Sequence, residues 1–171
     1  MMRRTKLMII IASILLAAIM LTGCKWGKKP PSPDYPEPPA DSNAETFVET
    51  EAQTEAKLDK VDGGGAVGLT YQTDVTVFMS SGLASIMFAN PSRSVDNVSV
   101  VLYVDGFRVA ESGILAPGTQ LTVLDLNDVG ERTIKNTGIY DGEFLVEFYN
   151  ADTNEKAVVN TRIPVRVIVQ N

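Results

Sequence analysis

The fold is decided by residues 97–111, which read Asn97-Val98-Ser99-Val100-Val101-Leu102-Tyr103-Val104-Asp105-Gly106-Phe107-Arg108-Val109-Ala110-Glu111. In the first half of this segment every second side chain is apolar, which is the period of a strand with one buried face. Asp105-Gly106 then gives a strong hairpin signal, because both residue types accept the positive φ angles of a two-residue turn. The segment therefore predicts two antiparallel strands, with an inward face made by Val98, Val100, Leu102 and Val104.

The same alternation recurs on both sides of this hairpin, with turn residues between the runs. Pro164 lies in the last run and has no amide hydrogen, so it predicts an edge strand or a bulge where the chain changes sheet. Seven predicted strands between residues 69 and 171 resemble the immunoglobulin-like β-sandwich, and the resemblance implies an all-β domain of two packed sheets. The five further strands are expected at about residues 74–78, 84–88, 121–126, 144–148 and 159–169.

Tyr140 follows Gly138 just ahead of a predicted strand. In immunoglobulin-like folds a tyrosine at this point forms a tyrosine corner, whose phenol bonds to upstream backbone and holds the crossover between the sheets. We therefore expect a structural role for Tyr140, and the alternative hypothesis is a platform on which a ligand stacks. The disulfide and core tryptophan of antibody domains are missing, so cohesion must come from burial of Val, Ile, Leu and Phe side chains.

The first residues of the chain have the pattern of an export signal. Basic residues precede an apolar run from Leu7 to Leu21 that is broken only by Ser13. As a helix this run would cover about 22 Å, less than the roughly 30 Å of bilayer hydrocarbon, which disfavours a permanent transmembrane anchor. The run ends in Leu21-Thr22-Gly23-Cys24, which resembles the lipobox of bacterial lipoprotein precursors. The resemblance implies a signal peptide at residues 1–23, with Leu21, Thr22 and Gly23 recognised by the signal peptidase; the alternative is an uncleaved hydrophobic anchor.

The same resemblance implies that the sulfur of Cys24 carries a diacylglyceryl group, and two acyl chains hold a protein stably on a membrane. Lys25, Trp26, Lys28 and Lys29 would then contact the membrane surface. Because Lys25 stands where the inner-membrane retention signal has aspartate, the localisation stays open between a Gram-positive membrane and a Gram-negative outer membrane. In both cases the chain is expected on the extracytoplasmic face.

Residues 24–68 are predicted to be a lipidated N-terminus followed by a linker, because no stretch in them has a strand pattern. The proline-rich residues 30–39 favour a semi-rigid polyproline II rod. Residues 44–59 nearly repeat in fours, which predicts fluctuating helix or disorder. Residues 63–68 satisfy G-x-G-x-x-G, the dinucleotide fingerprint, but no strand precedes them and no helix pattern follows, so a hinge is expected and no nucleotide.

Composition narrows the chemistry. The chain has no histidine and a single cysteine, Cys24, which excludes Ser-His-Asp triads, Cys-His dyads, disulfides within the chain and ordinary zinc sites. Removal of residues 1–23 takes 3 of the 15 basic residues and none of the 21 acidic ones, which leaves a net charge of −9. Nucleic acid is therefore not an expected partner. We expect neither a cofactor nor enzymatic activity.

Two groups of oxygen-bearing residues are candidates for metal binding or catalysis. Residues 125–131 are the densest group, with Asp125, Asn127 and Asp128 as candidate calcium ligands, but their spacing misses the EF-hand pattern and a solvated loop is favoured. A glycoside hydrolase would need two carboxylates that converge in space. The sequence leaves open whether any of these do so: Asp105, Glu111, Asp141, Glu143 and Glu147.

The sequence thus favours a lipid-anchored cell-envelope protein that displays a β-sandwich for protein–protein contact, as an accessory part of an envelope assembly. An extracellular solute- or glycan-binding module is the alternative hypothesis, with Tyr71, Phe107 or Tyr149 as aromatic platforms. A carboxylate-based hydrolase is the third.

Overall fold

The computed structural model describes residues 38–50, 56–59 and 65–171. Nearly all regular structure in them is β, with one short helix, α2, of residues Asp128–Thr133. None of the helices described is long and apolar enough to cross a membrane. The strands are β1 (Glu45–Thr46), β2 (Thr70–Tyr71), β3 (Asp74–Phe78), β4 (Leu83–Asn90), β5 (Asn97–Val104), β6 (Phe107–Glu111), β7 (Thr119–Asp125), β8 (Gly138–Tyr149) and β9 (Thr161–Gln170).

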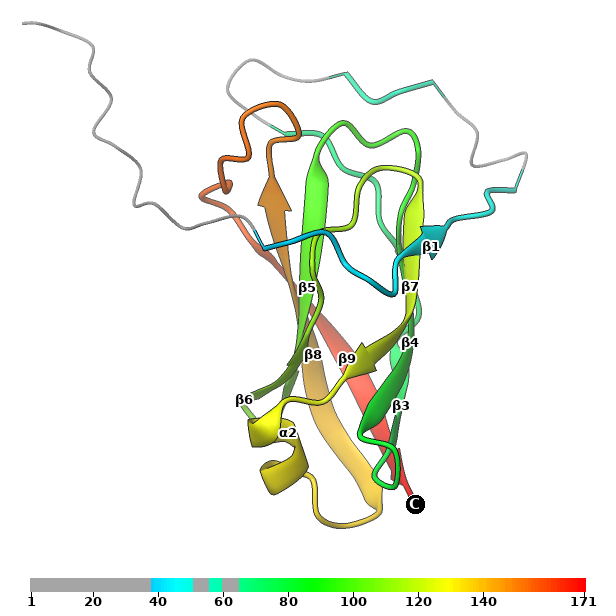
Figure 1. The fold of residues 1–171 in the computed structure, drawn as a ribbon, viewed down its shortest axis with the longest axis vertical. Helices are drawn as coiled ribbons and strands as arrows, with labels where there is room; N and C mark the ends of the chain where they lie inside the picture. Colours follow the sequence, from blue (N-terminus) through cyan, green and yellow to red (C-terminus); the bar gives the residue numbers. More distant parts are fainter. Residues whose placement is uncertain (1–37, 51–55, 60–64) are drawn as a thin grey trace, which may run out of the picture. The chain divides into compact units, whose positions relative to one another are not determined.

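The strands form one hydrogen-bonded path, β1-β7-β4-β3-β9-β8-β5-β6, with β2 paired beside β4. All pairs are antiparallel except β3 with β9, which is parallel. At this parallel pair the path turns from one layer, β1-β7-β4-β3, into the other, β9-β8-β5-β6 (Figure 1). This order of strands is that of an immunoglobulin-like sandwich, with β1 in the outermost place of the first layer.

The core lies between the two layers. Phe88 of β4 and Phe144 of β8 are both fully buried, and their rings meet edge to face with centroids 5.9 Å apart. Because β4 and β8 are not neighbours in the path, this contact shows that the two layers face each other. The core is otherwise built from aliphatic side chains, as expected for a domain without a disulfide. The prediction of an all-β, immunoglobulin-like sandwich is confirmed.

The hairpin predicted at residues 97–111 is formed by β5 and β6. Asp105 and Gly106 have φ angles of 50° and 82°, the backbone that a tight two-residue turn requires. Glycine reaches this backbone without strain, and aspartate is among the few other residues that accept it. Val98, Val100, Leu102 and Val104 are all fully buried, as the alternation predicts.

Pro164 lies in the first half of β9, where only β8 pairs with the strand. The parallel pairing with β3 begins at Arg166, two residues later. An amide hydrogen at position 164 has no strand to meet on the β3 side, so proline is tolerated there. At Pro164 β9 is therefore an edge strand, the first of the two places that the proline indicated.

The sequence showed no strand pattern between residues 25 and 68, and here the structure differs. Residues 45–46 pair with Gln120 and Thr119 of β7, and Phe47 is only 9% exposed. A strand of two residues is too short to produce an alternation pattern, so only the tertiary contacts reveal it. Residues 43–50 and 56–59 contain no helix. The remaining predictions for residues 25–37, 51–55 and 60–64 lie outside the described residues.

Candidate contact surfaces

The outward face of the layer β9-β8-β5-β6 carries a cluster of an aromatic ring and two charges. Phe144 and Val146 of β8 point into the core. Because side chains alternate along a strand, the preceding residue, Glu143, points outward. The Arg162 guanidinium of β9 bonds to Glu143 and lies 5.9 Å from the ring centroid of Tyr103 on β5. The ion pair is largely exposed, so its contribution to stability is small and salt-dependent. The cluster is therefore available to an incoming partner.

An open depression of about 250 Å³ lies beside this cluster, next to the turn at Asp105-Gly106 between β5 and β6. Tyr103 and Pro164 give it apolar area, and three carboxylates surround it. The structure thus brings together Asp105, Asp141 and Glu143 of the five carboxylates considered from sequence. Among the described residues there is no group of three or more acidic, cysteine or histidine side chains that could hold a metal ion. The lining residues are Tyr103, Asp105, Gly106, Asp141, Gly142, Glu143 and Pro164.

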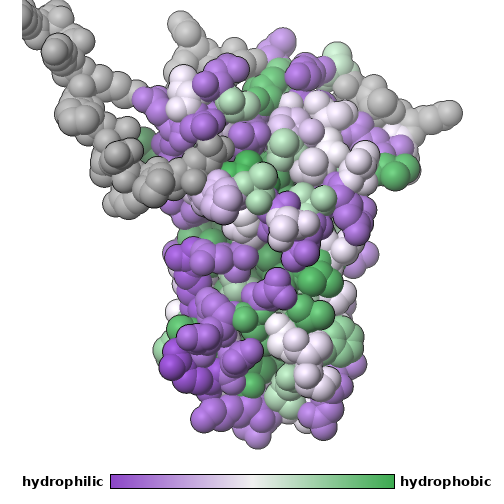
Figure 2. Space-filling model, in the orientation of Figure 1, coloured by the Kyte–Doolittle hydropathy of each residue, from purple (hydrophilic) through white to green (hydrophobic). Residues whose placement is uncertain are grey.

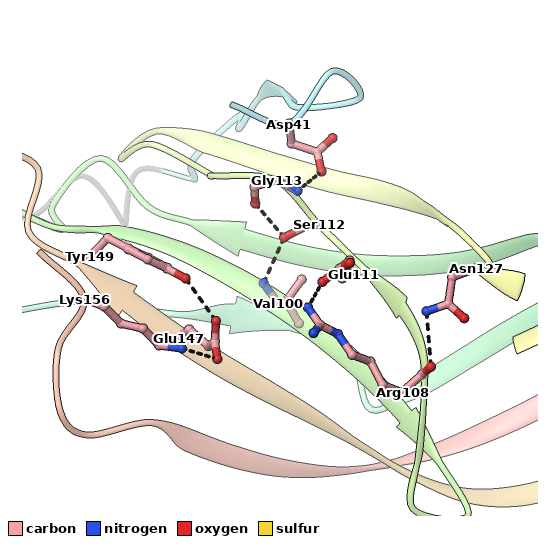
Figure 3. Close-up of polar contacts among 10 residues, drawn as sticks. All are labelled: Asp41, Val100, Arg108, Glu111, Ser112, Gly113, Asn127, Glu147, Tyr149 and Lys156. Carbon is pink, nitrogen blue, oxygen red and sulfur yellow. Dashed lines mark hydrogen bonds and ion pairs between the residues drawn. The ribbon is translucent and has the colours of Figure 1, made fainter. Parts of the chain in front are cut away.

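The other two carboxylates are held elsewhere by basic side chains. Glu111 pairs with Arg108 on β6 (Figure 3). Glu147 accepts a hydrogen bond from Lys156 Nζ at 2.6 Å and another from Tyr149 Oη at 3.0 Å (Figure 3). Glu143 and Glu147 do share the outward face of β8, which the sequence could not decide. Glu143 pairs with Arg162 and Glu147 pairs with Lys156, so the two carboxylates do not form a converging pair.

Tyr149 and Lys156 also fix the base of the loop between β8 and β9. The Ala157 amide donates to the Phe148 carbonyl at 2.8 Å, which closes that base. Val158 and Val159 follow this base, just before β9, and are 100% and 72% exposed. The chain therefore presents two exposed apolar side chains between the closed base of the loop and the last strand.

The three aromatic residues proposed as ligand platforms do not form one surface. Tyr149 is 3% exposed and its hydroxyl is bonded to Glu147, so it cannot serve as a platform. Tyr71 is exposed on β2, beside β4, whereas Phe107 is exposed on β6, at the far end of the strand path. A row of stacking rings, which the glycan hypothesis requires, is not present among these residues.

A second surface is formed where residues 38–50 lie against the sandwich. Asp41 Oδ2 accepts a hydrogen bond from the Gly113 amide at 2.7 Å (Figure 3). Ser112 Oγ donates to the Gly113 carbonyl at 2.7 Å and accepts from the Val100 amide at 2.9 Å. A chain of polar contacts therefore runs from the N-terminal segment to the buried strand β5.

This segment touches both layers on the side opposite the β3–β9 pair. The Asp41 amide donates to Ile114 O at 3.0 Å and the Ile114 amide donates to Pro39 O at 2.8 Å, just after β6 ends. β1 pairs with β7 of the other layer. An open slot of about 220 Å³ remains between the segment and the two layers. It is lined by Pro39, Ala40, Asp41, Ser42, Asn43, Glu111, Gly113, Val123, Leu124 and Asp125.

The Tyr140 hydroxyl donates to the Asn136 carbonyl at 3.0 Å, four residues upstream. This is the contact that a tyrosine corner requires. The stabilising role of Tyr140 stays a prediction.

Sequence reasoning missed the Arg162–Tyr103–Glu143 cluster, because its members lie on three strands and no local pattern connects them.

The candidate calcium residues do not form an open loop: Asp125 ends β7, and Asn127 and Asp128 begin helix α2. Asn127 is the N-cap, and its Oδ1 accepts from the amides of Val129 and Gly130, both at 2.9 Å. Asp128 lies in the first helical turn, where its negative charge suits the helix dipole. Asp125 Oδ2 faces the Asn43 side-chain amide at 3.5 Å. A loop was predicted here because a helix of six residues is too short to show a helical period.

One exposed ion pair connects the two layers at their junction. Arg166 of β9 donates to both carboxylate oxygens of Asp74 on β3, at 3.0 and 2.7 Å. The hydrogen bond and the charge of Asp74 raise the pKa of Arg166 above its ordinary value. Asp74 and Arg166 are direct partners in the register of the parallel pair, so the bidentate geometry matches that register.

The proposed lipid-attachment residues lie outside the described residues: Leu21, Thr22, Gly23, Cys24, Lys25, Trp26, Lys28 and Lys29.

Figure 2 shows polar and apolar residues mixed over the face in view, with apolar side chains in small separate areas. Large permanent interfaces bury extended apolar patches, so this face suits a smaller, mixed contact.

No family model matches the chain, and no curated protein matches it. Two of the solved structures that are similar in fold share little sequence identity with the chain. The periplasmic chaperone SfaE is 12% identical with a TM-score of 0.37; the match covers 61% of this chain and 58% of the chaperone. AggA, the major subunit of aggregative adherence fimbriae type I from Escherichia coli, is 13% identical with a TM-score of 0.34; the match covers 66% of this chain and 100% of AggA. The class of protein is therefore defined by the strand order alone, an immunoglobulin-like β-sandwich.

Proposed function

We propose that this chain is a lipid-anchored cell-envelope protein whose β-sandwich makes protein–protein contact on the extracytoplasmic side, as an accessory part of an envelope assembly. The lipobox-like Leu21-Thr22-Gly23-Cys24 supports the anchor, with membrane lipid bound through diacylglyceryl-cysteine. The net charge of −9 after signal removal repels anionic surfaces and suits a module held away from the bilayer.

The observation that carries the contact role is the cluster of Tyr103, Glu143 and Arg162 beside an open depression. Tyrosine and arginine are the residues most enriched where binding energy concentrates in protein interfaces. They project from paired strands of one layer, so little backbone order has to be gained on binding. Because the depression is small, at about 250 Å³, we expect a transient contact or one that belongs to a larger assembly.

The anchor is tested by the intact mass of the chain from isolated membranes. We expect a mature chain that begins at Cys24 and carries acyl groups, and a Cys24→Ala variant that loses this mass and leaves the membrane fraction. Unmodified protein with residues 1–23 still attached would contradict the anchor.

The contact role is tested by a photo-crosslinking amino acid at exposed Asp141, which borders the depression. Thr122, exposed on β7 of the other layer, is the matched control. We expect a defined protein adduct from position 141 and none from position 122. Because interface hot spots contribute about 2 kcal/mol or more, Tyr103→Ala should lower the yield by at least about tenfold. Adducts with only lipid or wall sugar would contradict the proposal.

A further inference from the structure

The N-terminal segment of residues 38–50 occupies a site shaped to receive it. A Cβ atom added at Gly113 would lie 2.7 Å from Asp41 N and would also overlap Pro39 O, so only glycine lets the segment approach β6 this closely. Phe47 inserts its side chain to 9% exposure, and its amide donates to Gly118 O at 2.9 Å. Glu49 then accepts hydrogen bonds from the backbone amide and hydroxyl of Ser92. The site therefore recognises the segment with backbone, apolar and charged contacts.

The segment is separable from the body that it docks on. Residues 51–64 connect it to the rest of the sandwich, and the contacts given above for the segment are noncovalent. Its strand β1 has only two residues, whereas the other layer strands are paired along five to twelve. The seven-strand path from β7 to β6 does not depend on β1, because β1 lies at the end of the path. Release of the segment therefore leaves the sandwich paired.

We propose that the site on β7 and Gly113 also takes residues 38–50 of a second copy of this chain. An exchanged segment makes the same contacts as a segment docked on its own chain. The equilibrium between the closed and the exchanged form therefore depends on the local concentration of copies and on the length of the connecting residues 51–64. Fourteen connecting residues reach at most about 46–50 Å, more than the roughly 30 Å diameter of a small domain. To reach a second copy, the described part of this connection also has to release the bond from the Leu58 amide to Arg93 O, 2.8 Å long.

The lipid anchor raises the local concentration that favours exchange, and in this respect the inference rests on the proposed function. Copies held by residue 24 would share one surface, with the segment only 14 residues further along the chain. Confinement of this kind converts a weak encounter between copies into a frequent one. The inferred partner is therefore an identical copy, joined by strand exchange beside β7, on the side of the sandwich opposite the β3–β9 pair.

The test uses two tagged forms of the full chain produced in the same cells, one with Thr46→Cys and the other with Thr119→Cys. These residues are direct partners in the β1–β7 register. Neither form can make a 46–119 disulfide within itself, so a disulfide between the two tags reports exchange. Thr122→Cys replaces Thr119→Cys in the control; it lies on the same strand but about 10 Å from the register partner, too far for a disulfide.

We expect the 46–119 heterodimer on nonreducing gels at a yield at least about tenfold above the 46–122 control, because only the register pair meets disulfide geometry. A chain without introduced cysteines controls for Cys24. Equal yields for the two pairs would overturn the exchange. So would a chain carrying both Thr46→Cys and Thr119→Cys that closes its own disulfide while the mixed forms give no heterodimer.

The same mixture is then purified in detergent and oxidised at increasing protein concentration. Heterodimer in this arm supports exchange without any membrane, so the inference can hold even if the anchor is refuted. Conversely, the adduct at Asp141 lies on the other layer, so its outcome does not depend on β1. Absence of the 46–119 product in both arms overturns the inference and leaves the proposed contact role intact.

Discussion

Substitution of Gly113 by alanine tests whether residues 38–50 are held against the sandwich. The added Cβ would overlap Pro39 O and Asp41 N, both backbone atoms that cannot turn aside as a side chain would. The segment must therefore move, and three hydrogen bonds are lost with it. They join the Gly113 amide to Asp41 Oδ2, the Asp41 amide to Ile114 O, and the Ile114 amide to Pro39 O. The sandwich core is untouched by this change.

The magnitude follows from these three hydrogen bonds. Neutral bonds contribute about 0.5–1.5 kcal/mol each and a bond to a carboxylate about 1.5–3 kcal/mol. We take the lower end of each range because the site is partly open to solvent, and alanine in place of glycine returns about 0.5 kcal/mol through the unfolded chain. The expected loss is about 2 kcal/mol, or a fall of about 8 °C in Tm for a domain of this size.

Stability is measured by chemical and thermal unfolding, and the segment itself by limited proteolysis between residues 38 and 50. Gly106→Ala is the control, because Gly106 has a φ of 82° and open space around it. It should lower stability by about 1 kcal/mol through backbone strain without making the segment more cleavable. If Gly113→Ala keeps wild-type stability and wild-type cleavage, the docked position of residues 38–50 is refuted.

Three further variants or conditions test other parts of the fold. Tyr140→Phe removes the bond to Asn136 O and should cost about 0.5–1.5 kcal/mol in urea unfolding; unchanged stability would argue against a tyrosine corner. Ser112→Ala leaves the buried Val100 amide without its acceptor and should cost about 1–3 kcal/mol, whereas Ser112→Thr, which restores a hydroxyl, should recover part of the loss. Calcium should leave Tm unchanged relative to chelator, because the Asn127 oxygen caps helix α2; a midpoint that rises with metal concentration would show a site.

The sequence determined the architecture because each of the seven longer strands, β3 to β9, carries its own signal. The buried positions Val98, Val100, Leu102 and Val104 follow from a two-residue period, and the turn at Asp105-Gly106 follows from the φ angles that these residues accept. Pro164 indicated a strand with one unpaired side, and in the structure no strand pairs with β9 on its β3 side at this residue. All of these features depend on residues that are close along the chain.

Only the tertiary structure decided where the surfaces lie. Asp41 and Gly113 are 72 positions apart, and Glu143 meets Arg162 across 19, so no local period connects them. Tyr149 looked like an available ring, but its neighbours bury it. Contacts of this kind depend on strand register and on which edge each strand occupies, and these are settled when two sheets pack, not by the pattern within any one strand.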